Sequence, residues 1–425
     1  MSNHPSWRLG HPVRAAPHHR HQASLEGILD MSLLSLEPLA PAARQAARQT
    51  FYRIVEHFAA VDPSPAPGSV PPPRRTTTYS HPLLIRYTYE YALSDESRDV
   101  FLRAFFNSMA LTIDGVEGIN RLDDNNPVLD FEELAPLFAG FAEYLMDNFF
   151  LPLKASTRKT PQPSPAFHSA VLRAQGDVSA GAAAGFVETP DRLSSLRGVC
   201  LVRDHYRCVI SRKFHGAYFM DRLLNEGPEA RDDEGHLLSD VQQGQLDNLE
   251  VAHILPHSLM KAAGSEAGEP DAARQAALAI LNMFDKGVVH MIDGVDIDRA
   301  RNALTLTPYM HMLFGSFQVY FEPVLGSGNT YRIQSFFAPQ FNNVLGLPTT
   351  RTLVKTEDCT IDPPSPRLLA VHRAIAHILH LSGAGDYIER VLYDMEDSVV
   401  RSDGTSQLGR IVQLRLSGWV DGAVY

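Results

Sequence analysis

Hydrophobic and polar residues follow two patterns along this chain, one typical of amphipathic helices and one of short strands. Helical spacing of the apolar residues predicts helices over residues 41–60, 97–112, 131–150, 191–204, 270–285, 368–381 and 386–399. Alternation predicts strands over residues 251–254, 303–306, 319–324, 330–336 and 411–416, of which the third and fourth form a hairpin. Thr307 followed by Pro308 predicts one more helix, to about residue 316, because threonine caps helices and proline is favoured at their first position. Together these elements predict an α+β fold.

Stretches rich in proline, serine, alanine and glycine divide the chain into parts. We expect a disordered tail over residues 1–22 and a helical N-terminal domain over 23–150, in which residues 62–81 form a proline-rich loop. Residues 151–190 read as a linker. A central module follows over 191–340, and residues 341–425 form a small α/β extension, mainly helical, packed on that module.

The composition is that of a globular protein, with 44% hydrophobic residues among 425. No apolar run approaches the roughly 18 residues that a membrane span needs, and the first residues lack the apolar core of a secretory signal. The three cysteines, Cys200, Cys208 and Cys359, form no closely spaced pair, which argues against a disulfide framework and a structural zinc knuckle. We therefore expect an intracellular protein, with nucleus and cytoplasm both open.

Charge is distributed unevenly. The net charge of −11 argues against a general nucleic-acid coat protein. Residues 191–225, however, hold seven basic and three acidic residues, and the segment 226–247 that follows is acidic. Within the basic segment Arg207, Arg212 and Lys213 are candidate phosphate contacts. The alternative is that they belong to an ordinary solvated surface.

Three polar residues of the central module carry candidate chemistry. His253 lies in an alternating apolar run, where a neutral imidazole can take a proton from water near pH 7. Asn302 opens the next strand, and His311 follows nine positions later in the helix that begins at Pro308. Asn302 and His311 can offer a carbonyl oxygen and a ring nitrogen to one divalent cation, which would stabilise charge on a phosphate.

The order and spacing of these residues resemble the HNH endonuclease motif, a ββα-metal finger. The resemblance extends to the Ile-Leu-Pro after His253 and to an upstream run, Arg203-Asp204-His205-Tyr206-Arg207-Cys208-Val209-Ile210-Ser211, similar to a hairpin that precedes such motifs. Met312-Leu313-Phe314 and the later Val319-Tyr320-Phe321 resemble the form found in fungal HNH-nuclease-domain proteins. The resemblance covers residues 190–340 well.

The resemblance implies a metal-dependent endonuclease that hydrolyses phosphodiester bonds in DNA or RNA. It gives catalytic roles to His253 and Asn302 and metal-binding roles to His311 and Asn302, with one divalent ion, Mg²⁺ before Mn²⁺ or Zn²⁺. Two positions depart from the pattern: Ala252 stands where many relatives have a metal-binding Asp or His, and Gly315 where many have Asp. The alternative hypothesis is a degenerate HNH domain that binds nucleic acid or protein without catalysis. A protein partner would bind through the N-terminal helical region.

Overall fold

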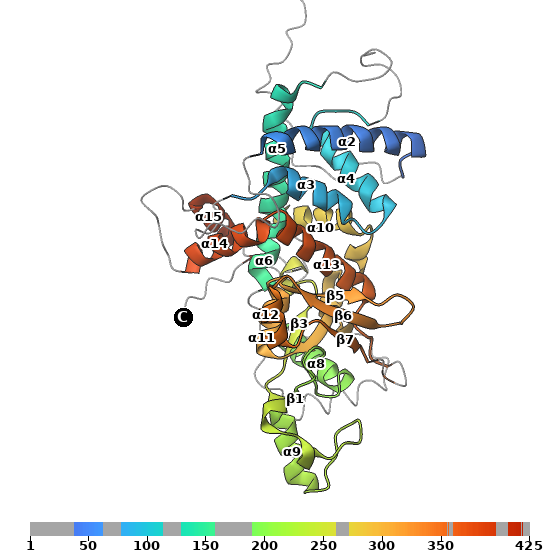
Figure 1. Cartoon of the computed structure of the whole chain (residues 1–425), viewed down its shortest axis with the longest axis vertical. Helices are drawn as coiled ribbons and strands as arrows, with labels where there is room; N and C mark the ends of the chain where they lie inside the picture. The colour runs from blue at the N-terminus through green and yellow to red at the C-terminus, as the bar shows by residue number, and fades with distance from the viewer. Residues whose placement is uncertain are drawn as a thin grey trace, which may run out of the picture.

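The computed structural model describes residues 38–62, 78–113, 129–157, 189–260, 272–354, 356, 360–396, 407–417 and 419. The expected tail over residues 1–22 and most of the proline-rich loop lie outside them. Figure 1 shows the N-terminal helices at one end, a small strand-and-helix module in the middle and α9 at the other end. Helices with small, mainly antiparallel sheets confirm the α+β prediction.

The described residues of the N-terminal part form four helices: α2 (Pro41–Val61), α3 (His81–Glu90), α4 (Asp95–Ser108) and α5 (Phe131–Leu145). Their buried faces meet in an aromatic core, in which the Phe51 ring lies 5.0 Å from Phe105 and 4.8 Å from Tyr89. Helix α3 was not predicted, although Ser80 caps it through Leu83 N–H and Pro82 stands at its start. A capping serine with proline close behind is the signal that would have located it.

The predicted linker begins too early. The chain continues without a break from α5 through a π-helical turn, η1 (Met146–Phe150), into α6 (Leu151–Thr157). Leu151, Leu153 and Lys154 are buried there, and the Lys154 ammonium donates to the Gly385 carbonyl. The linker prediction rested on proline, serine, alanine and glycine in residues 151–190, but apolar burial keeps the first turns of this stretch helical. Residues 158–188 lie outside the described part, and residues 189–190, the end of the predicted linker, already belong to a helix.

The central module is built on a strand pair and a helix. Strands β3 (Glu250–His253) and β4 (Ala303–Leu306) pair antiparallel, with His253 opposite Ala303. Helix α11 (Pro308–Gly315) follows at once, and the Thr307 side chain caps it by accepting from Met310 N–H. Helix α8 (Thr189–Arg203) packs on both strands. The predicted strands, cap and helix are confirmed.

The segment between β3 and β4 begins with η4 (His257–Met260) and contains α10 (Ala272–Phe284). Helix α10 packs on α4 and η1 of the N-terminal part, and the Phe284 ring stacks on Phe149 at 5.3 Å. The chain returns to β4 through the 3-10 turns η5 (Val288–Met291), η6 (Gly294–Asp298) and η7 (Ala300–Asn302). The insert therefore joins the N-terminal helices to the central module.

A second sheet follows α11. Strands β5 (Val319–Pro323), β6 (Thr330–Ser335) and β7 (Thr349–Thr352) pair antiparallel in that order, and α12 (Pro339–Leu345) connects the last two. The hairpin was predicted; α12 and β7 were not. Helix α13 (Pro366–Leu381) packs on β5 and also on α3. The C-terminal part therefore contacts the N-terminal helices as well as the central module, and one continuous hydrophobic cluster spans all three.

Two more helices complete the C-terminal part, α14 (Ala384–Glu396) and α15 (Leu408–Leu416). We predicted a strand over 411–416, which is wrong. Ile411 and Leu414, three positions apart, both turn their side chains into the core. Helical packing against α14 overrides an alternation too short to specify a strand.

The segment before β3 projects away from the rest of the molecule (Figure 1). Strand β1 (Phe214–His215) pairs parallel with β2 (Leu246–Asp247), and α9 (Gly216–Glu226) lies between them in the chain. The short 3-10 turns η2 (Leu238–Asp240) and η3 (Gln243–Gln245) lead back to β2. Among the described residues, none of the helices has the length and apolar character of a membrane span.

His372 of α13 is packed against α11, as expected for a histidine among apolar residues. Its ring stacks on Phe314 at 3.8 Å and on Phe317 at 4.6 Å, and its Nε2 lies 3.1 Å from the Phe314 carbonyl oxygen. Burial lowers the pKa of His372 to about 3, against a reference value of about 6.5.

This pKa predicts a pH-dependent stability. Between roughly pH 6.5 and 3 the unfolded chain binds a proton at His372 that the folded chain does not. The free energy of unfolding should therefore fall as pH falls, by up to about 1.4 kcal/mol per pH unit from this residue. The free energy of unfolding, measured with denaturant at pH 6, 5 and 4, should depend less steeply on pH in His372→Gln. The difference in slope should correspond to nearly one proton bound on unfolding. Equal slopes in the two proteins would contradict the assignment.

Candidate functional site

Asn302 holds the loop after β3 in place. Its side-chain oxygen accepts from Leu255 N–H at 2.9 Å, and its amide nitrogen donates to the carbonyls of Leu255 and Ile297 at 2.9 Å each. The residue is fully buried. Because the carboxamide is enclosed and bonded to backbone on both sides, it does not face a space for an ion. The structure thus points to a positioning role in place of the predicted metal-binding one.

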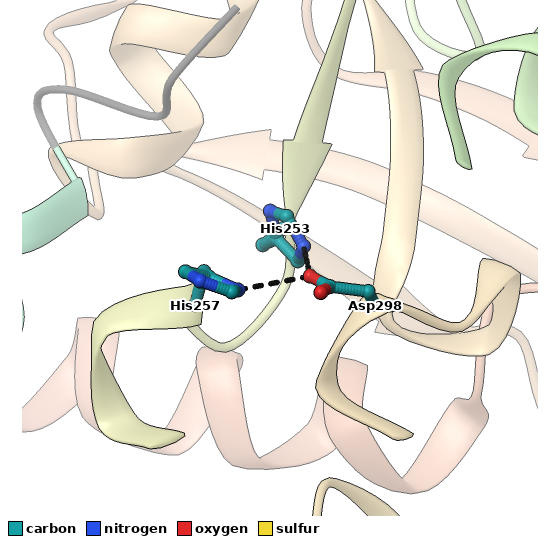
Figure 2. Close-up of side chains that lie close together, drawn as sticks. All are labelled: His253, His257 and Asp298. Atoms are coloured by element: carbon teal, nitrogen blue, oxygen red, sulfur yellow. Dashed lines mark hydrogen bonds and ion pairs between the residues drawn. The ribbon is translucent and has the colours of Figure 1, made fainter. Parts of the chain in front are cut away.

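Three side chains converge at the end of β3 (Figure 2). His253 Nε2 lies 3.1 Å from Asp298 Oδ1, and His257 Nδ1 lies 2.9 Å from the same oxygen. They come from β3, η4 and η6, and the side chains of His253 and Asp298 are only 2% and 3% exposed. Arg192 of α8 places its Nε 3.4 Å from the other oxygen of Asp298. The loop that Asn302 fixes therefore brings two imidazoles to one carboxylate.

Electrostatics keep this carboxylate ionised. Burial alone would raise the pKa of Asp298, but the hydrogen bonds from His253 and His257 lower it well below its usual range. Burial lowers the pKa of His253, against the opposing effect of Asp298. A neutral imidazole beside an anionic carboxylate is the state in which a histidine accepts a proton.

A second polar pair lies at the other end of β3. Glu250 points to α11, where its Oε2 is 2.7 Å from His311 Nδ1. The hydrogen bond from His311 lowers the pKa of Glu250, and Arg197 adds to the effect. The two side chains are 29% and 11% exposed, so the pair is accessible from solvent.

The two departures from the HNH pattern have local explanations. Ala252 is buried and lies on the same strand face as Glu250, whose longer side chain reaches His311. Gly315 sits against α6: its carbonyl accepts from the Thr157 hydroxyl at 2.5 Å, and a Cβ there would come within 3.0 Å of the Thr157 carbonyl oxygen. Glycine at 315 is thus explained by close packing of the N-terminal helices.

The Arg203–Asp204 pair at the end of α8 is bonded to strand β4. Arg203 is fully buried; it donates to both oxygens of Asp204 and to the carbonyls of Ala300 and Ala303. Asp204 accepts in turn from Thr305 N–H at 3.3 Å. This charge pair ties the end of α8 to β4 and the turn before it.

The three predicted phosphate contacts are all bonded within the protein. Arg207 donates to Asp232 at 2.6 Å and lies over the Phe214 ring, Arg212 pairs with Glu234, and Lys213 lies 2.9 Å from Asp247. The acidic segment 226–247 therefore neutralises much of the basic segment before it. Arg212 and Lys213 are still 32% and 41% exposed, whereas Arg207 is 14% exposed.

Sequence reasoning missed Glu250, His257 and Asp298. Glu250 lies three positions before His253 and His257 four after it, so a search for metal-binding or acid–base residues around His253 would have found both. Asp298 lies 45 positions from His253, and only the fold brings it there.

An antiparallel strand pair followed directly by a helix, with histidines on the first strand and on the helix, is the ββα-metal arrangement. Residues 208–322 match the family model described as HNH endonuclease, so an HNH domain is present in this part of the chain. That family generally hydrolyses nucleic acids. Searches of curated proteins and of solved structures gave no match. The resemblance to fungal proteins stays a prediction.

Proposed function

We propose that this protein is a metal-dependent endonuclease that hydrolyses phosphodiester bonds in DNA or RNA. One observation carries the proposal: the strand pair and helix of an HNH domain hold His253 on β3 and a Glu250–His311 pair between β3 and α11. His253 would supply the base, and Glu250 and His311 would supply a pair of metal ligands.

His253 is the proposed proton acceptor for the attacking water. Asp298 positions its ring, and Asn302 positions the loop that follows it. Because Nε2 donates its hydrogen bond to the ionised Asp298, a neutral ring has its lone pair on Nδ1, which is the nitrogen proposed to accept a proton from the water. In this proposal His253 is the catalytic base, and Asp298 and Asn302 are positioning residues.

Glu250 and His311 would hold the divalent cation. A carboxylate oxygen and an imidazole nitrogen 2.7 Å apart are close to the separation of two ligands around one small ion, about 3 Å for bonds near 2.1 Å. A bound Mg²⁺, with Mn²⁺ or Zn²⁺ as alternatives, would stabilise the charge on the phosphate and its leaving oxygen. Arg212 and Lys213 remain proposed nucleic-acid contacts that exchange a carboxylate partner for phosphate, and Arg207 a less accessible one.

The metal assignment predicts the effect of a conservative change. Glu250→Gln keeps the shape but removes the anionic ligand, so Mn²⁺ affinity measured by calorimetry should fall at least ~10-fold. Metal-supported cleavage of plasmid and RNA by chelator-treated protein should fall with it. Glu226→Gln, a change of an exposed glutamate on α9, is the matched control and should leave both unchanged. Unaltered Mn²⁺ affinity in Glu250→Gln would place the ion elsewhere.

A second candidate is a binding module without catalysis. Burial of the His253 side chain and the hydrogen bond from its Nε2 to Asp298 favour it, because neither leaves the ring open to solvent. This candidate predicts nucleic-acid or protein binding with no cleavage under any of the three metals. A protein partner on the N-terminal helices stays a prediction.

A further inference from the structure

We propose that His253, His257 and Asp298 form a second cation site, suited to a borderline transition metal such as Zn²⁺ and separate from the Glu250–His311 pair. Filling it would take the Nε2 of His253 and so inhibit the nuclease. The binding half stands on geometry alone; the inhibitory half rests on the proposed function.

The donor atoms are arranged as ligands of one ion. His253 Nε2, His257 Nδ1 and Asp298 Oδ1 all lie within 4.8 Å of one another. The carboxylate oxygen is 3.1 and 2.9 Å from the two nitrogens, whereas ligands about 2.1 Å from a tetrahedral ion lie about 3.4 Å apart. A shift of a few tenths of an ångström therefore opens the space for an ion.

The surroundings hold the ligands in place. His253 and Asp298 are almost fully buried, and His257 is 19% exposed, which leaves one side for an ion to enter. Arg192 contacts the second oxygen of Asp298, so the first oxygen alone faces the histidines. Outer contacts that orient a ligating carboxylate are a regular feature of metal sites. An ion bound to ligands from β3, η4 and η6 would also link these three segments.

Ligand chemistry separates the two sites. Two imidazoles and one carboxylate favour Zn²⁺ and related transition metals, whereas Mg²⁺ prefers oxygen ligands and keeps its waters. Mg²⁺ should therefore leave this cluster unoccupied. Zn²⁺ would bind both histidines, and a neutral imidazole bound through Nε2 carries its proton on Nδ1 and so cannot accept another from water.

The test is a titration of chelator-treated full-length protein with Co²⁺, whose visible absorption reports nitrogen and oxygen ligation. The double variant Glu250→Gln with His311→Gln removes the other proposed site, and the signal is assigned to this cluster when a further change at His257 or Asp298 reduces it. We expect one Co²⁺ per chain in that background. Adding His257→Gln, or separately Asp298→Asn, should weaken binding at least ~10-fold. Circular dichroism identifies any variant that fails to fold.

A double variant without a Co²⁺ signal, or with binding unaffected by His257→Gln and Asp298→Asn, would overturn the site. In Mg²⁺-supported cleavage, added Zn²⁺ should inhibit the otherwise wild-type protein, and His257→Gln should raise the Zn²⁺ needed for half inhibition at least ~10-fold. Zn²⁺ inhibition that is the same in both proteins would overturn the regulatory half. If the wild type cleaves nothing, the nuclease proposal and this inhibitory half both fail, while the Co²⁺ titration still decides the site.

Discussion

His253→Ala should lower the single-turnover rate of nucleic-acid cleavage at least ~10²-fold, the usual scale for loss of a general base. The change removes the imidazole that β3 brings to the site and leaves Asp298 bonded to His257. Binding of uncleaved nucleic acid should change little, because the proposed phosphate contacts lie on Arg212 and Lys213. Rates are measured with metal in excess, and binding with chelator present.

His236→Ala is the matched control for this variant. That histidine is 71% exposed on the acidic segment between α9 and β2, and its change should leave both rate and binding intact. If His253→Ala and His236→Ala have equal rates, His253 is not the base.

Arg203→Met should lower the free energy of unfolding by about 3–5 kcal/mol, the cost of leaving one member of a buried ion pair alone. Methionine fills much of the space, but Asp204 loses both guanidinium donors, keeps the Thr305 N–H and stays buried. The Ala300 and Ala303 carbonyls lose their donors as well. Denaturant unfolding of the purified variant measures the effect.

Arg203→Met combined with Asp204→Asn provides the control. Neutralising the stranded carboxylate should recover part of the lost stability, since an uncharged amide costs less to bury. Arg299→Met, an arginine that is 55% exposed, should change stability by less than about 1 kcal/mol. A loss of that small size for Arg203→Met would show that the buried pair does not support the strands.

The central module could be predicted because its local signals agree with its tertiary structure. Alternation around Val251 and Leu304, the Thr307 cap and the Pro308 start all specify the same strand pair and helix. The secondary structure after α5 and near the C-terminus was harder to predict, because burial against distant partners determines it. Pro152 lies in a helix that is packed among the C-terminal helices, and Ile411 lies in a helix against α14.

The candidate site was predicted in part. His253 and His311 lie where the motif places them, on β3 and α11. For Asn302, the motif identified the residue but not its contacts. Its three hydrogen bonds to backbone depend on a loop conformation that no local pattern specifies. Arg207 is similar, since its partner Asp232 lies 25 positions away in the acidic segment. The basic residues of this segment predicted phosphate contacts, but in the folded protein their side chains pair with acidic residues of the same chain.

The central claim is that His253 activates water to hydrolyse a phosphodiester bond beside a divalent ion. Cleavage of plasmid and of RNA in ¹⁸O-labelled water, with Mg²⁺ or Mn²⁺ restored to chelator-treated protein, tests it most directly. If His253 is the base, each new terminal phosphate carries one labelled oxygen, in a reaction that needs the metal and is nearly abolished in His253→Ala. Absence of cleavage under every metal, products without label, or labelled products formed equally well by His253→Ala would contradict it.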